Sequence, residues 1–265
     1  MRSRLSLNQM TVDQWGAREA AEACRRHGIS HIGLWRHKIA AIGVAETAKI
    51  VREEGLDVSS LCRGGMFPAA TPAERAERIA DTKRAVDEAA ALGAGVLVLV
   101  CGPAPDRDIG AARQMVEEGI AAVAPYARER GIQLGIEPLH PMFAADRSVI
   151  SSLAQATGIA ERCDTGVVID VYHVWWDPDL YREIERARGR ILGFHVSDWV
   201  APPPDHLKGR GMMGDGVIEI SRIRKAVDAA GYTGPIEIEI FNQALWNSPG
   251  DEVMAKAVER FCATV

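Results

Sequence analysis

The chain has 265 residues, of which 47% are hydrophobic, 25% charged and 6% aromatic, and its formal net charge is −5. The composition excludes collagen-like, fibrous and disordered proteins. The acidic charge argues against nucleic-acid binding, because nucleic-acid binders usually carry a basic excess. The five cysteines are scattered and form no Cys-x-x-Cys pair, which predicts reduced thiols.

Short β-branched apolar runs alternate with longer segments of helical period along the whole chain. The sequence predicts strands at residues 4–8, 31–35, 58–62, 96–101, 133–137, 167–170, 191–196 and 236–241. It predicts helices at residues 14–27, 44–54, 73–92, 109–130, 149–161, 179–188, 218–230 and 252–263.

Residues that start and stop helices support these limits. Thr71 and Pro72 are typical of a helix start, with a capping hydroxyl followed by proline in the first turn. Glycine follows several of the predicted helices, where a left-handed residue commonly ends the helix. These glycines are Gly28, Gly55, Gly93, Gly131 and Gly231.

Eight strand–helix units with none left over predict a parallel sheet that closes on itself. We therefore expect a single (β/α)8 TIM barrel over residues 1–265, with no second domain. The main alternative is an open doubly wound sheet, which normally has a glycine-rich phosphate-binding turn after its first strand. Here that turn reads Asn8-Gln9-Met10-Thr11 and contains no glycine.

In such a barrel the carboxyl ends of all strands meet at one mouth, where catalytic residues lie. The last four predicted strands bring Glu137, Asp170, His195 and Glu239 to that mouth. Because side chains alternate along a strand, these residues point inward only if their apolar neighbours face the helices. For three of the four, the expected outward neighbours are Leu134 and Ile136; Leu192, Phe194 and Val196; and Ile236, Ile238 and Ile240.

Three carboxylates and one imidazole at close range repel one another unless a proton or a cation intervenes. A divalent cation resolves this repulsion, and the oxygen-rich donor set suits Mn²⁺, Mg²⁺ or Co²⁺, with Zn²⁺ as an alternative. The competing interpretation is that the four residues are separate strand-end polar groups, each held by a local partner.

The motifs around these residues are Ile-Glu-Pro-Leu-His-Pro (136–141), Ile-Asp-Val-Tyr-His (169–173), Phe-His-Val-Ser-Asp (194–198) and Ile-Glu-Ile-Phe (238–241). In order and spacing they resemble the metal-bearing strands of the xylose isomerase-like TIM-barrel superfamily. More narrowly, the chain resembles the sugar phosphate isomerase/epimerase family, which includes ketose 3-epimerases, hydroxypyruvate isomerases and inosose dehydratases. This resemblance implies a metal-dependent isomerase or epimerase of a keto sugar or derivative, acting through an enediolate.

The resemblance also implies roles for individual residues. Glu137, Asp170, His195 and Glu239 would hold one divalent metal, with Mn²⁺ the first expectation, and the two glutamates would exchange the substrate proton. His173 and Arg210 would bind substrate. The loop that carries Arg210 reads Gly-Arg-Gly-Met-Met-Gly-Asp-Gly at residues 209–216 and departs from the family's Pro-Gly-x-Gly pattern. Members of this branch are often homo-oligomers, and we expect one here.

Further candidates for substrate contact follow from position at strand ends. Trp35 closes a strand and offers a flat ring to a sugar, whereas Asn8 and Arg63 close early strands with polar groups. Arg63 would alternatively pair with a carboxylate at the mouth, and His140 would either reach the pocket or cap its loop. Four other tryptophans lie at or after strand ends and would contact ligand, clamp loops or form a subunit interface: Trp175, Trp176, Trp199 and Trp246.

Glu237 shares the inward parity of Glu239 but lies one layer deeper in the barrel. A buried carboxylate requires a partner, and Arg4 or His31 on neighbouring strands would supply it.

Other functions remain as alternatives. The same site supports a lyase, either a dehydratase or a decarboxylase. A non-catalytic sugar-binding barrel is a further alternative, but the loss of a metal-ligating residue that would mark it is not found in this sequence. A DNA-repair endonuclease would require more histidines and a basic surface.

The polar amino terminus is not typical of a signal peptide, and the apolar run at 96–101 is far shorter than the about 20 residues that span a bilayer. We therefore expect a cytoplasmic protein whose partner is a small carbohydrate, with no membrane and no nucleic acid bound.

Overall fold

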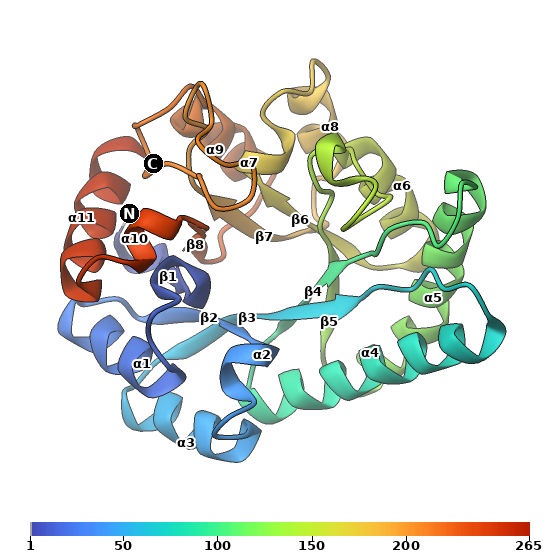
Figure 1. The fold of residues 1–265 in the computed structure, drawn as a ribbon, viewed down its shortest axis with the longest axis horizontal. Helices are drawn as coiled ribbons and strands as arrows, with labels where there is room; N and C mark the ends of the chain where they lie inside the picture. The colour runs from blue at the N-terminus through green and yellow to red at the C-terminus, as the bar shows by residue number, and fades with distance from the viewer. Residues whose placement is uncertain (1) are drawn as a thin grey trace.

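The computed structural model describes residues 2–265 and contains a closed barrel of parallel strands, in which β1 pairs with both β2 and β8 (Figure 1). The strand order follows the chain order, so the predicted (β/α)8 TIM barrel is confirmed. The strands are β1 (Leu5–Asn8), β2 (His31–Trp35), β3 (Asp57–Gly65), β4 (Val96–Val100), β5 (Gln133–Ile136), β6 (Gly166–Asp170), β7 (Ile191–Val196) and β8 (Ile236–Ile238).

Helices surround the barrel, and short helical turns lie in the loops that leave the strands (Figure 1). The outer helices are α1 (Ala17–Arg26), α3 (Val44–Glu53), α4 (Pro72–Leu92), α5 (Ile109–Glu129), α6 (Leu153–Cys163), α8 (Leu180–Arg186), α9 (Ile220–Ala229) and α11 (Gly250–Thr264). The short turns are η1 (Arg2–Arg4), η2 (Gln9–Val12), α2 (Arg36–Ile39), η3 (Pro141–Phe143), α7 (Val171–Val174) and α10 (Gln243–Trp246).

The predicted limits differ from the observed ones mainly where loops begin. The helix expected from residue 149 begins at Leu153, because the Ser152 side chain accepts a hydrogen bond from the backbone of Gln155 and caps it. Strand β3 runs to Gly65, beyond the predicted end at residue 62, because Gly64 and Gly65 still pair with β4. The predicted capping glycines all have positive φ, between 66° and 94°, as a left-handed helix end requires.

Two apolar regions lie on the two sides of the sheet. The larger one packs the outward strand residues against the helices, and a smaller cluster fills the barrel with Cys62, Val96, Val98 and Val168. The predicted outward residues lie in the outer region with one exception, Leu192, which packs on the inner cluster.

The outward direction expected for Leu192 was wrong because the register between β6 and β7 shifts at this residue. Val167 pairs with Ile191, but the next residue, Val168, pairs with Gly193, so β7 carries an additional residue at this point. Alternation resumes at Gly193 and leaves His195 on the inner side.

Among residues 2–265 the five cysteines are free thiols, and no helix has the length and apolarity needed to cross a membrane.

Candidate metal centre and active site

The structure brings the four strand-end residues together at the mouth of the barrel. Glu137 directly follows β5, Asp170 ends β6, His195 lies near the end of β7, and Glu239 directly follows β8. Each offers one ligand atom, and these atoms all lie within 4.8 Å of one another. All four residues are at most 5% exposed. Because they come from consecutive strands, the barrel closure itself fixes this convergence.

The donor atoms of this cluster fit a metal ion. His195 Nδ1 lies 3.3 Å from Glu137 Oε1 and 3.8 Å from Glu239 Oε2. Nevertheless, both His195 ring nitrogens and Glu137 Oε1 are buried without a well-formed hydrogen bond among the described residues. Buried polar atoms that lack partners are costly, and a cation would satisfy the carboxylate oxygen and one ring nitrogen together.

The electrostatics of the cluster point the same way. Burial raises the pKa of Asp170 to about 7 and raises the pKa of Glu137 above its ordinary value. Burial opposes the charged form of Glu239 as well, but His195 and Arg210 outweigh it and lower the pKa of that carboxyl. Burial also favours a neutral His195, yet the nearby carboxylates, Glu237 foremost, hold its pKa well above the ordinary value. Burial thus favours the neutral forms of Asp170 and Glu137, and a cation in the cluster would stabilise their charged forms.

Arg210 lies directly against this cluster and is 3% exposed. Its Nη1 donates to Asp170 Oδ2 at 2.8 Å and to Glu239 Oε2 at 3.0 Å. The guanidinium lies between the Tyr172 and Phe241 rings, 4.5 and 4.8 Å from their centroids. This arrangement gives the carboxylates one fixed positive charge and holds the loop that carries Arg210 against the barrel.

His173 lies in the short helix α7, contacts Arg210 and lines the cavity. Its Nε2 lies 3.2 Å from Arg210 Nη2, and its Nδ1 accepts a hydrogen bond from the backbone of His140. Burial, followed by the Arg210 charge, lowers the pKa of His173 well below its ordinary value. The ring is therefore neutral near pH 7, and its two nitrogens face the His140 backbone and Arg210.

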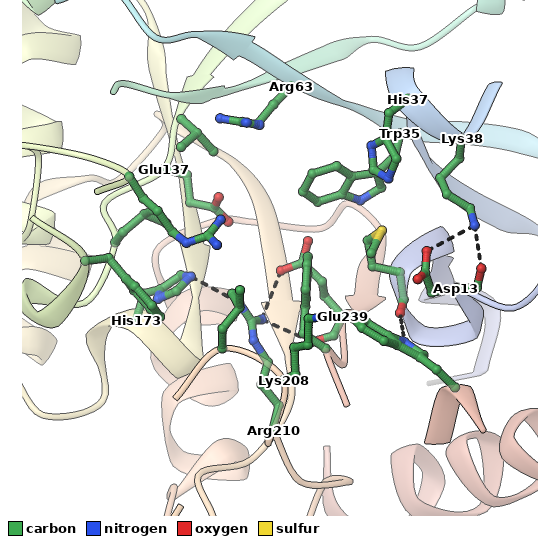
Figure 2. Close-up of a pocket in the computed structure, with 18 of the residues that line it drawn as sticks. Asp13, Trp35, His37, Lys38, Arg63, Glu137, His173, Lys208, Arg210 and Glu239 are labelled. Carbon is green, nitrogen blue, oxygen red and sulfur yellow. Dashed lines mark hydrogen bonds and ion pairs between the residues drawn. The ribbon is translucent and has the colours of Figure 1, made fainter. Parts of the chain in front are cut away.

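A cavity of about 710 Å³ opens above the cluster. Glu137 and Glu239 line it (Figure 2), whereas Asp170 and His195 are fully buried and are not among its lining residues. The predicted substrate residues His173, Arg210, Trp35 and Arg63 also line this cavity, and so do Met10, Asp13, Gln14, Trp15, Gly16, His37, Lys38, Val100, Leu139, Phe143, Arg147, Leu207, Lys208, Phe241 and Trp246.

Two predicted substrate residues lie elsewhere. Asn8 lies below the cavity, where its Nδ2 donates to Glu239 Oε1 at 3.1 Å and its Oδ1 accepts from Trp35 Nε1 at 2.8 Å. His140 caps helix η3 by accepting from the backbone of Met142, and its ring stacks on a tryptophan. Asn8 therefore positions two glutamates, Glu237 and Glu239, and His140 takes the loop-capping alternative.

Of the other predicted tryptophans, one lines the cavity and three contact loop residues. Trp246 lines the cavity. Trp199 stacks on Tyr172, with ring centroids 4.8 Å apart, and contacts Trp175, while Trp176 bonds the backbone of His173. These three clamp loops together.

Glu237 points into the barrel and is 3% exposed, as its parity predicts. Its Oε2 accepts from Asn8 Nδ2 at 3.0 Å and lies 3.6 Å from His195 Nε2. The predicted partners Arg4 and His31 were wrong. Arg4 belongs to η1, before the barrel, and turns outward to an aspartate of α9, 2.7 Å away.

His31 bonds the neighbouring Ser30 instead. The residue of β2 that faces Glu237 is Gly33, where a Cβ atom would lie 2.2 Å from the carboxylate. Glycine at this position therefore makes the room that the buried carboxylate occupies.

The cavity residues that sequence reasoning missed include Trp15, Lys38 and Arg147. They lie in loops or short turns that follow β1, β2 and β5, not at strand ends. Loop paths carry no periodicity, so their inward direction has no signal in one sequence. Trp15 alone offered a hint, as a large aromatic residue just after the β1 turn.

Residues 21–264 match the model of the family described as xylose isomerase-like TIM barrel. The chain belongs to this family. The protein SMc04130 of Sinorhizobium meliloti 1021 is 50% identical to it, and its crystal structure superposes with a TM-score of 0.98 over 100% of this chain and 99% of that one. Its name states no activity.

Solved structures of lower sequence identity share the fold. The IOLI protein, solved with a bound zinc atom, is 18% identical with a TM-score of 0.86, covering 99% of this chain and 98% of that one. D-allulose 3-epimerase from Methylomonas sp. is 18% identical with a TM-score of 0.79, covering 100% and 98%.

A curated relative is the 3-dehydroshikimate dehydratase of Pseudomonas putida, 27% identical over 167 residues. The match covers 58% of this chain and 24% of that protein, so the chain spans less than a quarter of that relative's length.

Proposed function

We propose that the chain is a divalent-metal-dependent isomerase or epimerase acting on a keto sugar or sugar derivative. The division of labour within the four-residue cluster carries this proposal. Glu137 and Glu239, which follow β5 and β8, line the cavity, while Asp170 and His195 are fully buried and do not line it. Two carboxylates are thus available both to a cation and to a substrate above it.

Glu137, Asp170, His195 and Glu239 would hold the metal, with Mn²⁺ as the first choice and Mg²⁺, Co²⁺ or Zn²⁺ as alternatives. When bound there, the cation would polarise a substrate carbonyl and acidify the hydrogen on the neighbouring carbon. The zinc atom in the IOLI structure supports a metal in this fold.

The residues of this chain perform the proton transfers. One of the two cavity glutamates removes the acidified hydrogen, and the other returns a proton to the opposite face or to the neighbouring carbon. The raised pKa of Glu137 favours its protonated form as the proton donor, whereas the lowered pKa of Glu239 keeps it ionised as a base. His173 and Arg210 hold the substrate oxygens, and Trp35 offers its ring to the sugar face.

Proton exchange with solvent tests this proposal directly. The Mn²⁺-loaded protein is incubated in D₂O with a panel of ketoses, and loss of the substrate C–H signal is followed by NMR. Glu137→Gln and Glu239→Gln should abolish exchange, and the exposed-site control Glu185→Gln should leave it unchanged. Exchange that survives in both cavity variants would contradict the assigned roles.

The similarity to a dehydratase favours one second candidate, a lyase that uses the same site. If a hydroxyl group β to the carbonyl departs after the proton is removed, the product is dehydrated. The same NMR experiment separates the two reactions, because a lyase forms a new enone signal and an isomerase gives deuterium incorporation without loss of water.

A further inference from the structure

Two arginines form part of the cavity wall, and neither hydrogen-bonds to a carboxylate among residues 2–265. Arg63 comes from β3, and Arg147 comes from the loop between η3 and α6, so they reach the cavity from different segments. Figure 2 shows the Arg63 side chain extended into the cavity on the side of Glu137. Neither arginine belongs to the four-residue cluster, and Arg210 already serves the carboxylates of that cluster.

The contacts of both guanidinium groups are poor for buried or half-buried charges. Arg63 Nη1 donates to the Met66 sulfur at 2.9 Å, a weak acceptor. Arg147 Nε lies 3.7 Å from the exposed carboxylate of Asp146, and it is buried without a hydrogen bond among residues 2–265. By contrast, Arg36 on the outer side of the same region bonds two carboxylates at 2.7 and 2.9 Å.

The two groups also line the same cavity, so their like charges face one space. Burial, followed by the charge of Arg147, lowers the pKa of Arg63, although a guanidinium keeps its charge at neutral pH. Two like charges that face one cavity raise its potential, and an anion placed between them would remove both the repulsion and the unsatisfied donors.

The charge inventory of the cavity points to the same ligand. The three carboxylates of the cluster are matched by a divalent cation together with Arg210, and Lys38 is paired with Asp13 at 3.0 Å. Of the remaining charged groups, Glu237 is buried beside His195, whereas Arg63, Arg147 and Lys208 line the cavity, so the loaded cavity still has an excess of positive charge.

We propose that Arg63 and Arg147 form a subsite for an anionic oxygen group of the substrate, a carboxylate or a phosphate. This proposal rests on the proposed function, because it places the anionic end of the molecule whose hydroxy-ketone end reacts at the cluster. The arginine fork matches both anions, which therefore share one recognition chemistry.

Three small hydroxy-ketones test the subsite. Dihydroxyacetone is neutral, dihydroxyacetone phosphate adds a phosphate, and hydroxypyruvate adds a carboxylate to the same reactive unit. Each is titrated calorimetrically into Mn²⁺-loaded protein, into Arg63→Gln and Arg147→Gln, and into Arg188→Gln, which removes an exposed arginine outside the cavity. Arg63→Lys, which keeps the charge without the fork, is measured alongside.

At least one anionic probe should bind about tenfold or more tightly than dihydroxyacetone, as expected for charge-assisted hydrogen bonds. That advantage should fall about tenfold in each cavity variant, recover in part in Arg63→Lys and persist in Arg188→Gln. The probe that shows the advantage identifies the anion. The subsite is overturned if no anionic probe binds more tightly than dihydroxyacetone, or if both arginine variants leave the advantage intact.

Failure of the proposed reaction would look different. If no probe exchanges protons with solvent but an anionic probe binds in an arginine-dependent way, the subsite stands and the isomerase proposal does not.

Discussion

Replacing Arg210 by methionine should destabilise the metal-free protein strongly and the metal-loaded protein less. Methionine keeps an unbranched stem of similar reach, so the change chiefly removes the charge and its hydrogen bonds. Arg210 Nη1 donates to Asp170 Oδ2 at 2.8 Å and to Glu239 Oε2 at 3.0 Å in a fully buried setting. Removing one partner of such a pair costs about 3–5 kcal/mol, because the other charges stay buried and uncompensated.

A divalent cation in the cluster supplies the missing positive charge. The deficit of Arg210→Met should therefore shrink by about 1.4 kcal/mol or more at metal saturation, which by linkage means at least about tenfold tighter metal binding in the variant. The assay is urea unfolding at pH 7.5, followed by circular dichroism, with chelator or with saturating Mn²⁺.

A surface arginine provides the matched control. Arg128 pairs with Asp164 at 3.2 Å, and both side chains are more than half exposed. Arg128→Met should cost at most about 1 kcal/mol, with or without metal. If Arg210→Met loses equal stability in both conditions, or binds Mn²⁺ more weakly than wild type, Arg210 acts by holding loop geometry and the charge argument is refuted.

Three further predictions follow from the same site. Because burial raises the pKa of Asp170 from 3.8 to about 7, the folded metal-free protein binds an additional proton, so the stability of wild type relative to Asp170→Asn should fall as pH rises from 4 to 7 in urea unfolding; a rise would contradict the shift. Gly33→Ala should cost about 1–3 kcal/mol in the same assay, because its Cβ would lie 2.2 Å from the Glu237 carboxylate, whereas Gly95→Ala meets nothing within 4 Å and should stay within about 0.5 kcal/mol. Equal costs would refute the interior register. Glu237→Gln should weaken Mn²⁺ binding in calorimetry about tenfold or more, because Glu237 Oε2 lies 3.6 Å from His195 Nε2; unchanged affinity would exclude that support.

The sequence was sufficient for the barrel because its signals are local and repeated. Each strand–helix unit carries its own hydrophobic period and, in several units, its own capping glycine, so one misplaced limit does not change the topology. The four clustered residues were predictable for the same reason. They end consecutive strands, and a parallel barrel gathers all such ends at one mouth.

The errors have a common physical origin, because they concern features that depend on more than one segment of the chain. Leu192 points inward because a register shift between β6 and β7 adds a residue, and a shift depends on both strands. Arg4 is not the partner of Glu237 because it lies in η1, before the chain enters the barrel at β1. The direction of Arg147 depends on a loop path, which tertiary contacts decide.

The metal content of the purified protein tests the central claim most directly. The protein is stripped with chelator, reloaded with Mn²⁺, dialysed and measured by mass spectrometry, together with Asp170→Asn, Glu239→Gln and the exposed control Arg188→Gln. One metal per chain in wild type and in the control, lost in both cluster variants, is the predicted result. Wild-type protein that retains no metal, or cluster variants that retain as much as wild type, would contradict the four-residue metal centre.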